Sequence, residues 1–342
     1  MGGRCFLMIG GLWGGRKLAA WGPEVKEVPP APRRHFDAGS RQDTNPFKRT
    51  ERLTSTFPAE SRFVAAPDGL RLHYLDYPCP SKGRLPLVCL PGLARSADDF
   101  YLVAGAAQKS GRRVLALDYR GRGRSEWDSD WRHYDLDVEQ ADIFAVFADA
   151  GVTEAVFLGT SRGGLHTMRI SKARPTLVRA AILNDIGPTV EKEGLLRIKS
   201  YVGKLPPLSR LSDAVALMKM TAAPRFTGVG PEEWEIYARQ TFVEKDGRVE
   251  LRYDPALNHT LDAVTPETEF EEFWDSFETL AKLPILAIRG ETSDILSVAT
   301  LDEMARRAPG LEPYTVPGQG HAPLLLDQPT IGRIMNFLEA QP

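Results

Sequence analysis

The strongest chemical signal in the sequence is one short motif. Residues 159–163 read Gly-Thr-Ser-Arg-Gly, the pattern G-x-S-x-G, with Ser161 at its centre. An apolar run precedes the motif and a helical pattern follows it, which is the strand–turn–helix context of a nucleophilic serine. The turn is tight, so the residues two before and two after the serine must lack bulk. The positive end of the following helix points at the site, where it favours negative charge. The motif and its context therefore predict Ser161 as a nucleophile.

A serine hydroxyl is a weak nucleophile, so a base must accept its proton. His321 lies in the sequence Gly-Gln-Gly-His-Ala-Pro, after the last predicted strand and before the last predicted helix. That position brings it to the carboxyl edge of the sheet, where Ser161 also lies. We therefore expect His321 to be the base. The other histidines lie in the N-terminal stretch, the opening hairpin, loops and the helix after the serine: His35, His73, His133, His166 and His259.

The base needs a carboxylate that fixes its tautomer and stabilises its cation. Asp294 follows the predicted strand 283–288 and precedes His321, which gives the chain order Ser, Asp, His. Two other acids compete for this role. Glu291 lies nearer the end of the same strand, and Asp185 follows the preceding strand. Each of the three could instead cap a turn. We predict Asp294 and keep Asp185 as the main alternative.

Two N–H groups must hold the negative oxygen that forms when a carbonyl is attacked. One predicted donor is the backbone of Arg162, directly after the serine. The other is the backbone of Leu93, in the loop that follows the apolar run 86–90. Gly92 allows this loop to pass close to a substrate. These two groups form the predicted oxyanion hole.

The elements that must position these residues form an α/β fold. Continuous apolar runs, typical of strands buried on both faces, alternate with helical patterns. The alternation predicts a mostly parallel, eight-stranded sheet with helices on both faces. An opening hairpin, turning at residues 67–69, adds antiparallel strands at one edge. The predicted strands are 61–66, 70–77, 86–90, 113–117, 155–158, 178–183, 283–288 and 313–316, and the predicted helices are 97–109, 137–150, 162–172, 298–308 and 330–340.

The chain between the strands 178–183 and 283–288 is far longer than a crossover needs. It contains four helical patterns and a small hairpin over residues 242–253, which turns at Asp-Gly. We therefore predict a helical cap set over the sheet. The predicted cap is 188–281, and the predicted α/β core is 56–187 and 282–342.

Composition limits the setting in which this chain works. Residues 21–50 are rich in Pro, Arg and Lys and have no hydrophobic period, and residues 1–55 are predicted to be a disordered leader, with a weak export signal as the less favoured alternative. Cys5, Cys79 and Cys89 form neither a disulfide framework nor a metal-ligand pattern, so a cytoplasmic location is expected. No segment reaches the ~18 apolar residues of a membrane span. The formal net charge of -2 gives no reason to expect nucleic acid.

Taken together, these motifs resemble those of the α/β-hydrolase family over residues 63–340. Residues 118–125 look like the D-x-R-G-x-G-x-S loop of the family's cap-bearing esterase, enol-lactonase and haloperoxidase-like branch, and residues 320–323 resemble its terminal histidine loop. The family often has His-Gly where this chain has Pro-Gly at 91–92, which leaves the backbone donor in place. Ser161 sets the chain apart from branches with Asp or Cys at the nucleophile position, such as haloalkane dehalogenases, epoxide hydrolases and dienelactone hydrolases.

The resemblance implies a serine hydrolase that cleaves an ester or lactone of a small to medium acyl substrate, without metal or organic cofactor. A carbon–carbon bond hydrolase or a perhydrolase would use the same triad, and a non-catalytic ligand-binding module is an alternative of another class. Arg95 and Arg162 flank the predicted site; either could hold a substrate carboxylate, but solvation or local ion pairing is the simpler expectation. In the cap, Tyr201, Met218 and Trp234 are candidates for an acyl pocket.

Overall fold

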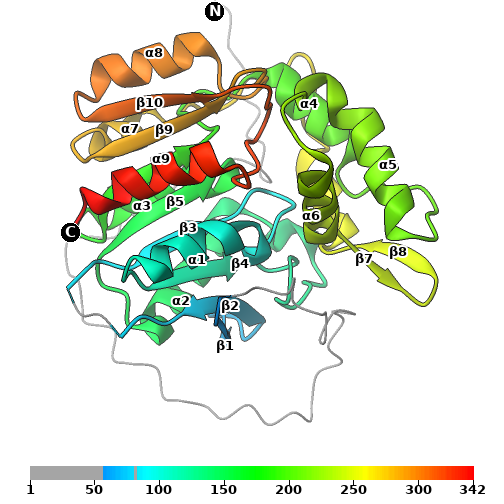
Figure 1. The fold of residues 1–342 in the computed structure, drawn as a ribbon, viewed down its shortest axis with the longest axis horizontal. Coiled ribbons are helices and arrows are strands. Elements are labelled where there is room, and N and C mark those ends of the chain that lie inside the picture. The colour runs from blue at the N-terminus through cyan, green and yellow to red at the C-terminus, as the bar shows by residue number, and fades with distance from the viewer. Residues whose placement is uncertain (1–56, 81–82) are drawn as a thin grey trace, which may run out of the picture.

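The computed structural model describes residues 57–80 and 83–342 and confirms the predicted α/β fold (Figure 1). Its main sheet has eight strands in the order β1-β2-β4-β3-β5-β6-β9-β10. The β1–β2 and β2–β4 pairs are antiparallel and the other neighbouring pairs are parallel, so the opening hairpin lies at one edge as predicted. The strands are β1 (Glu60–Ala65), β2 (Arg71–Tyr77), β3 (Leu87–Leu90), β4 (Val114–Asp118), β5 (Ala155–Thr160), β6 (Val178–Asn184), β9 (Ile285–Gly290) and β10 (Leu311–Val316).

Burial explains why the central strands carry continuous apolar runs. Every residue of β3 and β4 is buried, and so is every residue of β5 except its last. Successive side chains alternate between two cores, one on each face of the sheet. In β5, for example, Phe157 belongs to one core, and its neighbours Val156 and Leu158 belong to the other. The sheet is therefore hydrophobic on both faces, as parallel sheets are.

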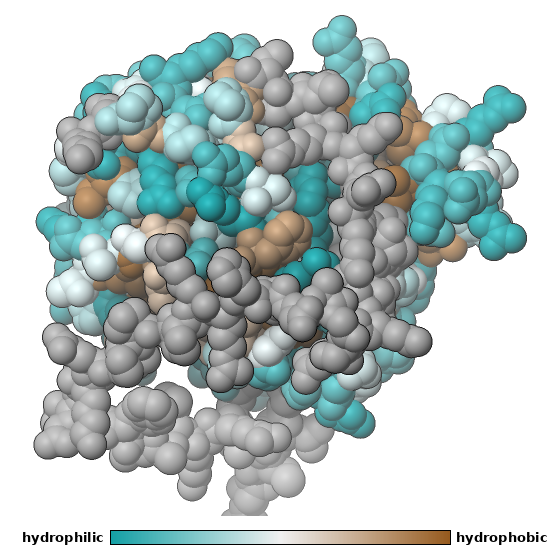
Figure 2. All heavy atoms as spheres, turned by 90° about the horizontal axis from the view of Figure 1, so that it is seen from below, coloured by the Kyte–Doolittle hydropathy of each residue, from teal (hydrophilic) through white to brown (hydrophobic). Residues whose placement is uncertain are grey.

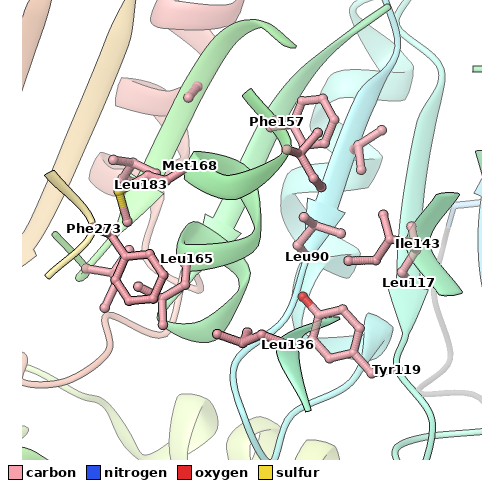
Figure 3. Packing of buried hydrophobic residues seen from close by; sticks show 14 of the residues in the cluster. Leu90, Leu117, Tyr119, Leu136, Ile143, Phe157, Leu165, Met168, Leu183 and Phe273 are labelled. Carbon is pink, nitrogen blue, oxygen red and sulfur yellow. The ribbon is translucent and has the colours of Figure 1, made fainter. Parts of the chain in front are cut away.

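Helices cover both faces of the sheet. α1 (Tyr101–Lys109) and α9 (Gln328–Glu339) supply apolar side chains to one core. The other core receives side chains from α2 (Leu136–Ala150), α3 (Arg162–Ala173), α7 (Trp274–Leu280) and α8 (Val298–Arg307). Figure 3 shows part of this second core, where Leu165 and Met168 of α3 gather with Leu183 and Phe273. The predicted core helices are thus present at the predicted places.

Between β6 and β9 the chain leaves the sheet. It forms three helices and a hairpin that lie together beside the sheet (Figure 1): α4 (Lys192–Tyr201), α5 (Leu211–Ala222), α6 (Pro231–Thr241), β7 (Phe242–Lys245) and β8 (Arg248–Leu251). We call residues 192–253 the cap. The last helix of the insertion, α7, packs instead against α3 on the sheet. The predicted cap segment, 188–281, therefore ends in a helix that belongs to the packing of the core.

Buried ion pairs attach the cap to the core. Asp98 lies in η1 (Ala97–Phe100), the short helix before α1, and its carboxylate accepts hydrogen bonds from Arg124 at 3.2 and 3.3 Å. The same carboxylate accepts a hydrogen bond from Arg252 of the cap at 2.5 Å. All three side chains are buried. Removing one partner of a buried ion pair is costly, so these contacts hold the cap in a fixed position at this end.

No helix in the described part of the chain has the length and apolar character that a membrane span requires. On the coloured part of the face shown in Figure 2, hydrophilic side chains predominate and hydrophobic ones appear in several separate places. The predicted disordered leader, residues 1–55, lies outside the described residues.

Candidate active site

Ser161 lies at the sharp turn between β5 and α3. Its φ of 52° and ψ of -115° are unusual for a residue other than glycine. Two glycines make the turn sterically possible, because a Cβ on Gly159 would lie 2.5 Å from the backbone of Gly163. A Cβ on Gly163 would lie 2.0 Å from the carbonyl oxygen of Leu90. The Ser161 N–H donates to the carbonyl of Asn184 at 2.9 Å and so ties the turn to β6. The predicted strand–turn–helix context is confirmed.

His321 lies within hydrogen-bonding distance of the serine. Its Nε2 is 2.9 Å from Ser161 Oγ. The loop that carries it connects β10 to α9, and the side-chain amide of Asn184 donates to the carbonyl of Pro323 in this loop at 3.0 Å. The imidazole side chain is only 6% exposed. The predicted pairing of hydroxyl and imidazole is present in the structure.

The carboxylate beside the imidazole belongs to Asp185 and not to the predicted Asp294. His321 Nδ1 lies 2.8 Å from Asp185 Oδ2, and the Asp185 side chain is completely buried. The prediction for Asp294 is therefore corrected. Asp185 occupies the position behind the imidazole. It is the acid after the preceding strand, which the sequence left open as the alternative.

Three donors fix the Asp185 carboxylate in this position. Asp185 directly follows β6 with a positive φ of 57°, which turns the chain sharply at the end of the strand. Its Oδ1 accepts the N–H of Gly290 at 2.7 Å, and its Oδ2 accepts the hydroxyl of Ser293 at 2.6 Å as well as the imidazole. Sequence reasoning missed Ser293. The one feature of the sequence that could have indicated Ser293 is its position in the loop after β9, directly before Asp294. The Asp294 side chain itself points away from the imidazole.

Asp294 turns toward the cap. Its carboxylate accepts two hydrogen bonds from Arg197 of α4, at 2.5 and 2.7 Å, and lies 3.4 Å from Nε of Arg225. Burial works to raise the pKa of Asp294. The hydrogen bond and charge of Arg197, with smaller contributions from His321 and Arg225, outweigh burial and hold that pKa below its usual value. Asp294 is thus an ionised anchor for two arginines.

The two predicted oxyanion donors lie beside the nucleophile. Arg162 is the first residue of α3, so its N–H belongs to the turn that has no acceptor within the helix. The loop of Leu93 comes close as well, because a Cβ on Gly92 would lie 3.8 Å from Cβ of Ser161. Among the backbone hydrogen bonds of turns, loops and helix caps in residues 57–80 and 83–342, none is donated by the N–H of Leu93 or Arg162. Neither N–H is therefore engaged in such a bond, and the role of both groups at an oxyanion stays a prediction.

The side chain of Arg162 is buried and extends to α2. It is 3% exposed, and its Nε donates to Glu139 of α2 at 2.6 Å. Glu139 also contacts Arg122 at 2.8 Å and His166 at 3.0 Å. Burial works to raise the pKa of Glu139, but the charges of Arg122 and Arg162 hold it well below its usual value. The expectation of a local ion pair for Arg162 is confirmed, and a role in holding a substrate carboxylate is not.

A cavity of about 520 Å³ lies between the cap and the core and reaches both the hydroxyl and the imidazole. Two of the three cap residues predicted for an acyl pocket, Tyr201 and Met218, line it. Trp234 does not. It is 5% exposed, and its ring packs against the rings of Phe226 and Tyr237. Trp234 therefore belongs to a hydrophobic cluster that the cap shares with Leu324 and Leu326 of the loop before α9.

The cavity lining carries more basic than acidic side chains. One acid lines it, Asp99, against four basic side chains: Arg95, Arg197, Lys204 and Arg225. Asp99 accepts two hydrogen bonds from Arg95, both at 2.7 Å. The charge of the Arg95 guanidinium is therefore balanced by Asp99. This confirms the expectation of a local ion pair for Arg95. The excess positive charge lies on the other three residues.

One group of described side chains has the spacing of metal ligands. Ligand atoms of Asp68, Asp128 and His133 lie within 4.8 Å of one another. Nη1 of Arg120 contacts both carboxylates, at 2.9 and 2.8 Å. A guanidinium therefore already supplies the positive charge at this cluster, which does not line the cavity.

Comparison with known proteins places this geometry in a family. The model of the alpha/beta hydrolase family matches residues 87–331. A 3-hydroxybutyrate-oligomer hydrolase from Cupriavidus necator is 34% identical over 280 residues, which cover 80% of this chain and 94% of that protein. A 2-(acetamidomethylene)succinate hydrolase from Mesorhizobium japonicum is 25% identical over 228 residues, which cover 66% of this chain and 78% of that protein.

Solved structures agree with this result. An alpha/beta hydrolase from Novosphingobium aromaticivorans matches with a TM-score of 0.77 and 37% identity, covering 83% of this chain and 99% of that one. The family model spans most of the described core, and the three similar proteins described here are named as hydrolases. The chain belongs to the alpha/beta hydrolase family.

Proposed function

We propose that the protein is a carboxylic-ester hydrolase that forms an acyl-enzyme intermediate on Ser161. The observation that carries this proposal is the series of contacts from Ser161 Oγ to His321 Nε2, at 2.9 Å, and from His321 Nδ1 to Asp185 Oδ2, at 2.8 Å. A hydroxyl, an imidazole and a buried carboxylate in this order form the arrangement that activates a serine. Membership of a hydrolase family supports the reaction class, and the adjoining cavity supports a small-molecule substrate.

In the proposed reaction, His321 accepts the Ser161 proton while the serine oxygen attacks the ester carbonyl. Asp185 holds the imidazole in place and stabilises its cation. The N–H groups of Leu93 and Arg162 bind the oxyanion, and each would lower the barrier by ~3 kcal/mol. The imidazolium then protonates the leaving alcohol, and the acyl group stays on the serine. A water molecule activated by the same imidazole releases the acid.

The cavity supports an ester or lactone of small to medium size. Its volume of about 520 Å³ falls within the usual range for small-molecule sites. Apolar side chains such as Leu217, Phe242 and Leu251 line it and suit an aliphatic acyl group. The similar protein from Cupriavidus necator is named for 3-hydroxybutyrate oligomers, so short aliphatic oligoesters belong among the substrates to test. Carbon–carbon bond cleavage and perhydrolysis would use the same three residues and are separated from ester hydrolysis by substrate profiling.

Labelling with a fluorophosphonate probe, followed by peptide mapping, tests the proposal. We expect modification at Ser161 in the wild type and none in Ser161→Ala, which should also lose hydrolysis of p-nitrophenyl butyrate. Ser209→Ala, a change at an exposed cap serine, is the matched control and should keep both properties. Modification at another residue, or full activity in Ser161→Ala, would contradict the proposal.

A further inference from the structure

We propose that Arg225 and Arg197, anchored by Asp294, form a subsite for a carboxylate carried by the leaving alcohol of the substrate. This inference rests on the proposed function, because it concerns the ester that the same cavity would receive. The substrate class that follows is an ester whose alcohol part is a hydroxy acid with a free carboxylate, as at the carboxyl end of a linear oligoester of hydroxy acids.

Both arginines line the cavity, and Arg225 keeps donors that Asp294 does not use. Arg197 binds Asp294 through Nε and Nη2 and also makes a hydrogen bond with the Tyr201 side chain. The contact between Arg225 and Asp294 is through Nε at 3.4 Å, which leaves the two terminal nitrogens of Arg225. The Arg225 side chain is 39% exposed, against 20% for Arg197. Because two guanidinium groups share one carboxylate, one positive charge stays uncompensated. A guanidinium is planar and can donate two parallel hydrogen bonds, so this charge suits a second carboxylate.

The other charges of the cavity do not compete for an anion to the same degree. Arg95 is paired with Asp99, the acid that lines the cavity. Lys204 is exposed, and its ammonium donates to the carbonyl of Lys199 at 3.1 Å. The uncompensated charge that is both partly buried and fixed therefore lies at the Arg197–Arg225 pair.

Backbone contacts hold Arg225 beside the catalytic imidazole. The Thr292 hydroxyl donates to the Arg225 carbonyl at 2.7 Å. Gly320 directly precedes His321, and a Cβ on Gly320 would lie 3.0 Å from Cβ of Arg225. Arg225 thus packs against the loop that carries the imidazole.

Arg197 is held from the same side. Gly194 lies one turn earlier on α4, and a Cβ there would lie 2.3 Å from the Asp294 carbonyl oxygen. This close approach fixes the helix against the loop after β9. Both arginines therefore lie on the imidazole side of the cavity.

This placement selects the alcohol part of the ester over the acyl part. The leaving oxygen must come within reach of His321 Nε2 to receive its proton, so the alcohol occupies the imidazole side. A carboxylate on that alcohol would lie nearest the two arginines. Water adds to the acyl group and the alcohol oxygen gains a proton, so an acid and a hydroxy acid leave, while the bound carboxylate does not react.

A pair of matched esters tests the subsite. The butyryl ester of 3-hydroxybutyric acid carries the carboxylate on its alcohol, and the N-methylamide of that ester has the same single ester bond without the charge. We expect wild-type kcat/KM to favour the acid by about 10-fold or more, the usual range for a hydrogen bond to a charged group. Arg225→Ala should abolish most of this preference, chiefly through KM, and Arg225→Lys should restore part of it.

Arg248→Ala, which removes an exposed arginine of the cap hairpin, is the control and should keep the preference. Equal kcat/KM for acid and amide in the wild type would overturn the subsite, and so would an equal loss for both esters in Arg225→Ala. An Arg225-dependent preference for p-nitrophenyl hydrogen succinate over p-nitrophenyl butyrate would also overturn it, because that carboxylate lies on the acyl part.

Binding to Ser161→Ala separates the subsite from the proposed function. Calorimetry with this variant measures the affinity for acid and amide without turnover. Tighter binding of the acid that Arg225→Ala removes supports the subsite even if the wild type hydrolyses neither ester. Equal binding of acid and amide would overturn the subsite while hydrolysis of p-nitrophenyl butyrate still supported the proposed function.

Discussion

Asp185 and Asp294 both lie near the imidazole of His321, yet the structure gives them different partners. Asp185 contacts Nδ1 at 2.8 Å, whereas Asp294 is bound by Arg197. We expect Asp185→Asn to lower kcat for p-nitrophenyl butyrate by about 10⁴-fold, because an amide cannot hold the required tautomer or stabilise the cation. Asp294→Asn should lower it far less. Steady-state kinetics of the two isosteric variants checks the assignment, and a larger loss in Asp294→Asn would reverse it.

Ser293 is the residue-scale finding that the sequence did not provide. Its hydroxyl donates to the same Asp185 oxygen that faces the imidazole. Ser293→Ala should weaken the orientation of that carboxylate by about 1 kcal/mol, roughly 5-fold in kcat, with little change in KM. Ser293→Thr keeps the hydroxyl and should recover part of the loss. A loss of stability without a change in kcat would show that Ser293 only supports the loop.

At the scale of elements, the turn between β5 and α3 depends on the absence of side chains. A Cβ on Gly163 would lie 2.0 Å from the Leu90 carbonyl, and backbone cannot move as a flexible side chain can. Gly163→Ala should therefore destabilise the protein by about 3 kcal/mol or more and move Ser161 away from His321. Gly332→Ala is the control. Gly332 lies in α9 with open space around its Cα, so alanine there should stabilise by up to about 1 kcal/mol.

Denaturant unfolding of the two glycine variants checks this prediction. Equal free energies of unfolding for Gly163→Ala and the wild type would mean that the close approach between α3 and β3 relaxes easily. Activity of the folded fraction of Gly163→Ala provides the second measurement, because a displaced Ser161 lowers kcat even where the protein remains folded.

Elements with local signals were predictable. The strands 155–158 and 178–183 could be found because each is a continuous apolar run that must be buried on both faces. Ser161 could be found because its motif encodes the turn itself, and His321 because a single loop connects the last strand and the last helix. In each case the information lies within a few neighbouring residues.

Choices that depend on side-chain direction were not predictable. Asp185 and Asp294 both follow strands that end at the same edge, and order along the chain favoured Asp294. The outcome depends on the positive φ of Asp185 and on Arg197, a cap residue that takes Asp294 away from the imidazole. The partner of the Arg162 side chain was not predictable either, because this partner, Glu139, lies on another helix.

At the scale of the whole molecule, buried ion pairs join the cap to the core, and both parts contribute residues to the cavity. Asp98 is bound by Arg124 of the core and Arg252 of the cap. Asp98→Asn should weaken both ion pairs and lower the free energy of unfolding by about 3 kcal/mol. Thermal unfolding with Asp246→Asn as an exposed cap control checks this, and equal losses in the two variants would contradict it.

Two buried histidines make stability depend on pH. Burial lowers the pKa of His166 to about 4 from an ordinary value of 6.5, although its hydrogen bond to Glu139 acts in the opposite direction. Burial also lowers the pKa of His73, against the hydrogen bond to Asp118. Between pH 4 and 6.5 the unfolded chain therefore binds a proton at His166 that the folded protein does not. The stabilising contribution of His166 is therefore fully present above this window and is lost as the pH falls through it.

The contribution of His166 to this fall should be about 3 kcal/mol at most, as free energies of unfolding measured by denaturant titration at a series of pH values would show. His166→Gln should flatten the slope below pH 6.5 whatever its effect on stability at neutral pH. His259→Gln removes a histidine whose side chain is 45% exposed and should leave the slope as in the wild type. An unchanged slope in His166→Gln would mean that the buried imidazole gains a proton in the folded state, with Glu139 offsetting the cost of burial.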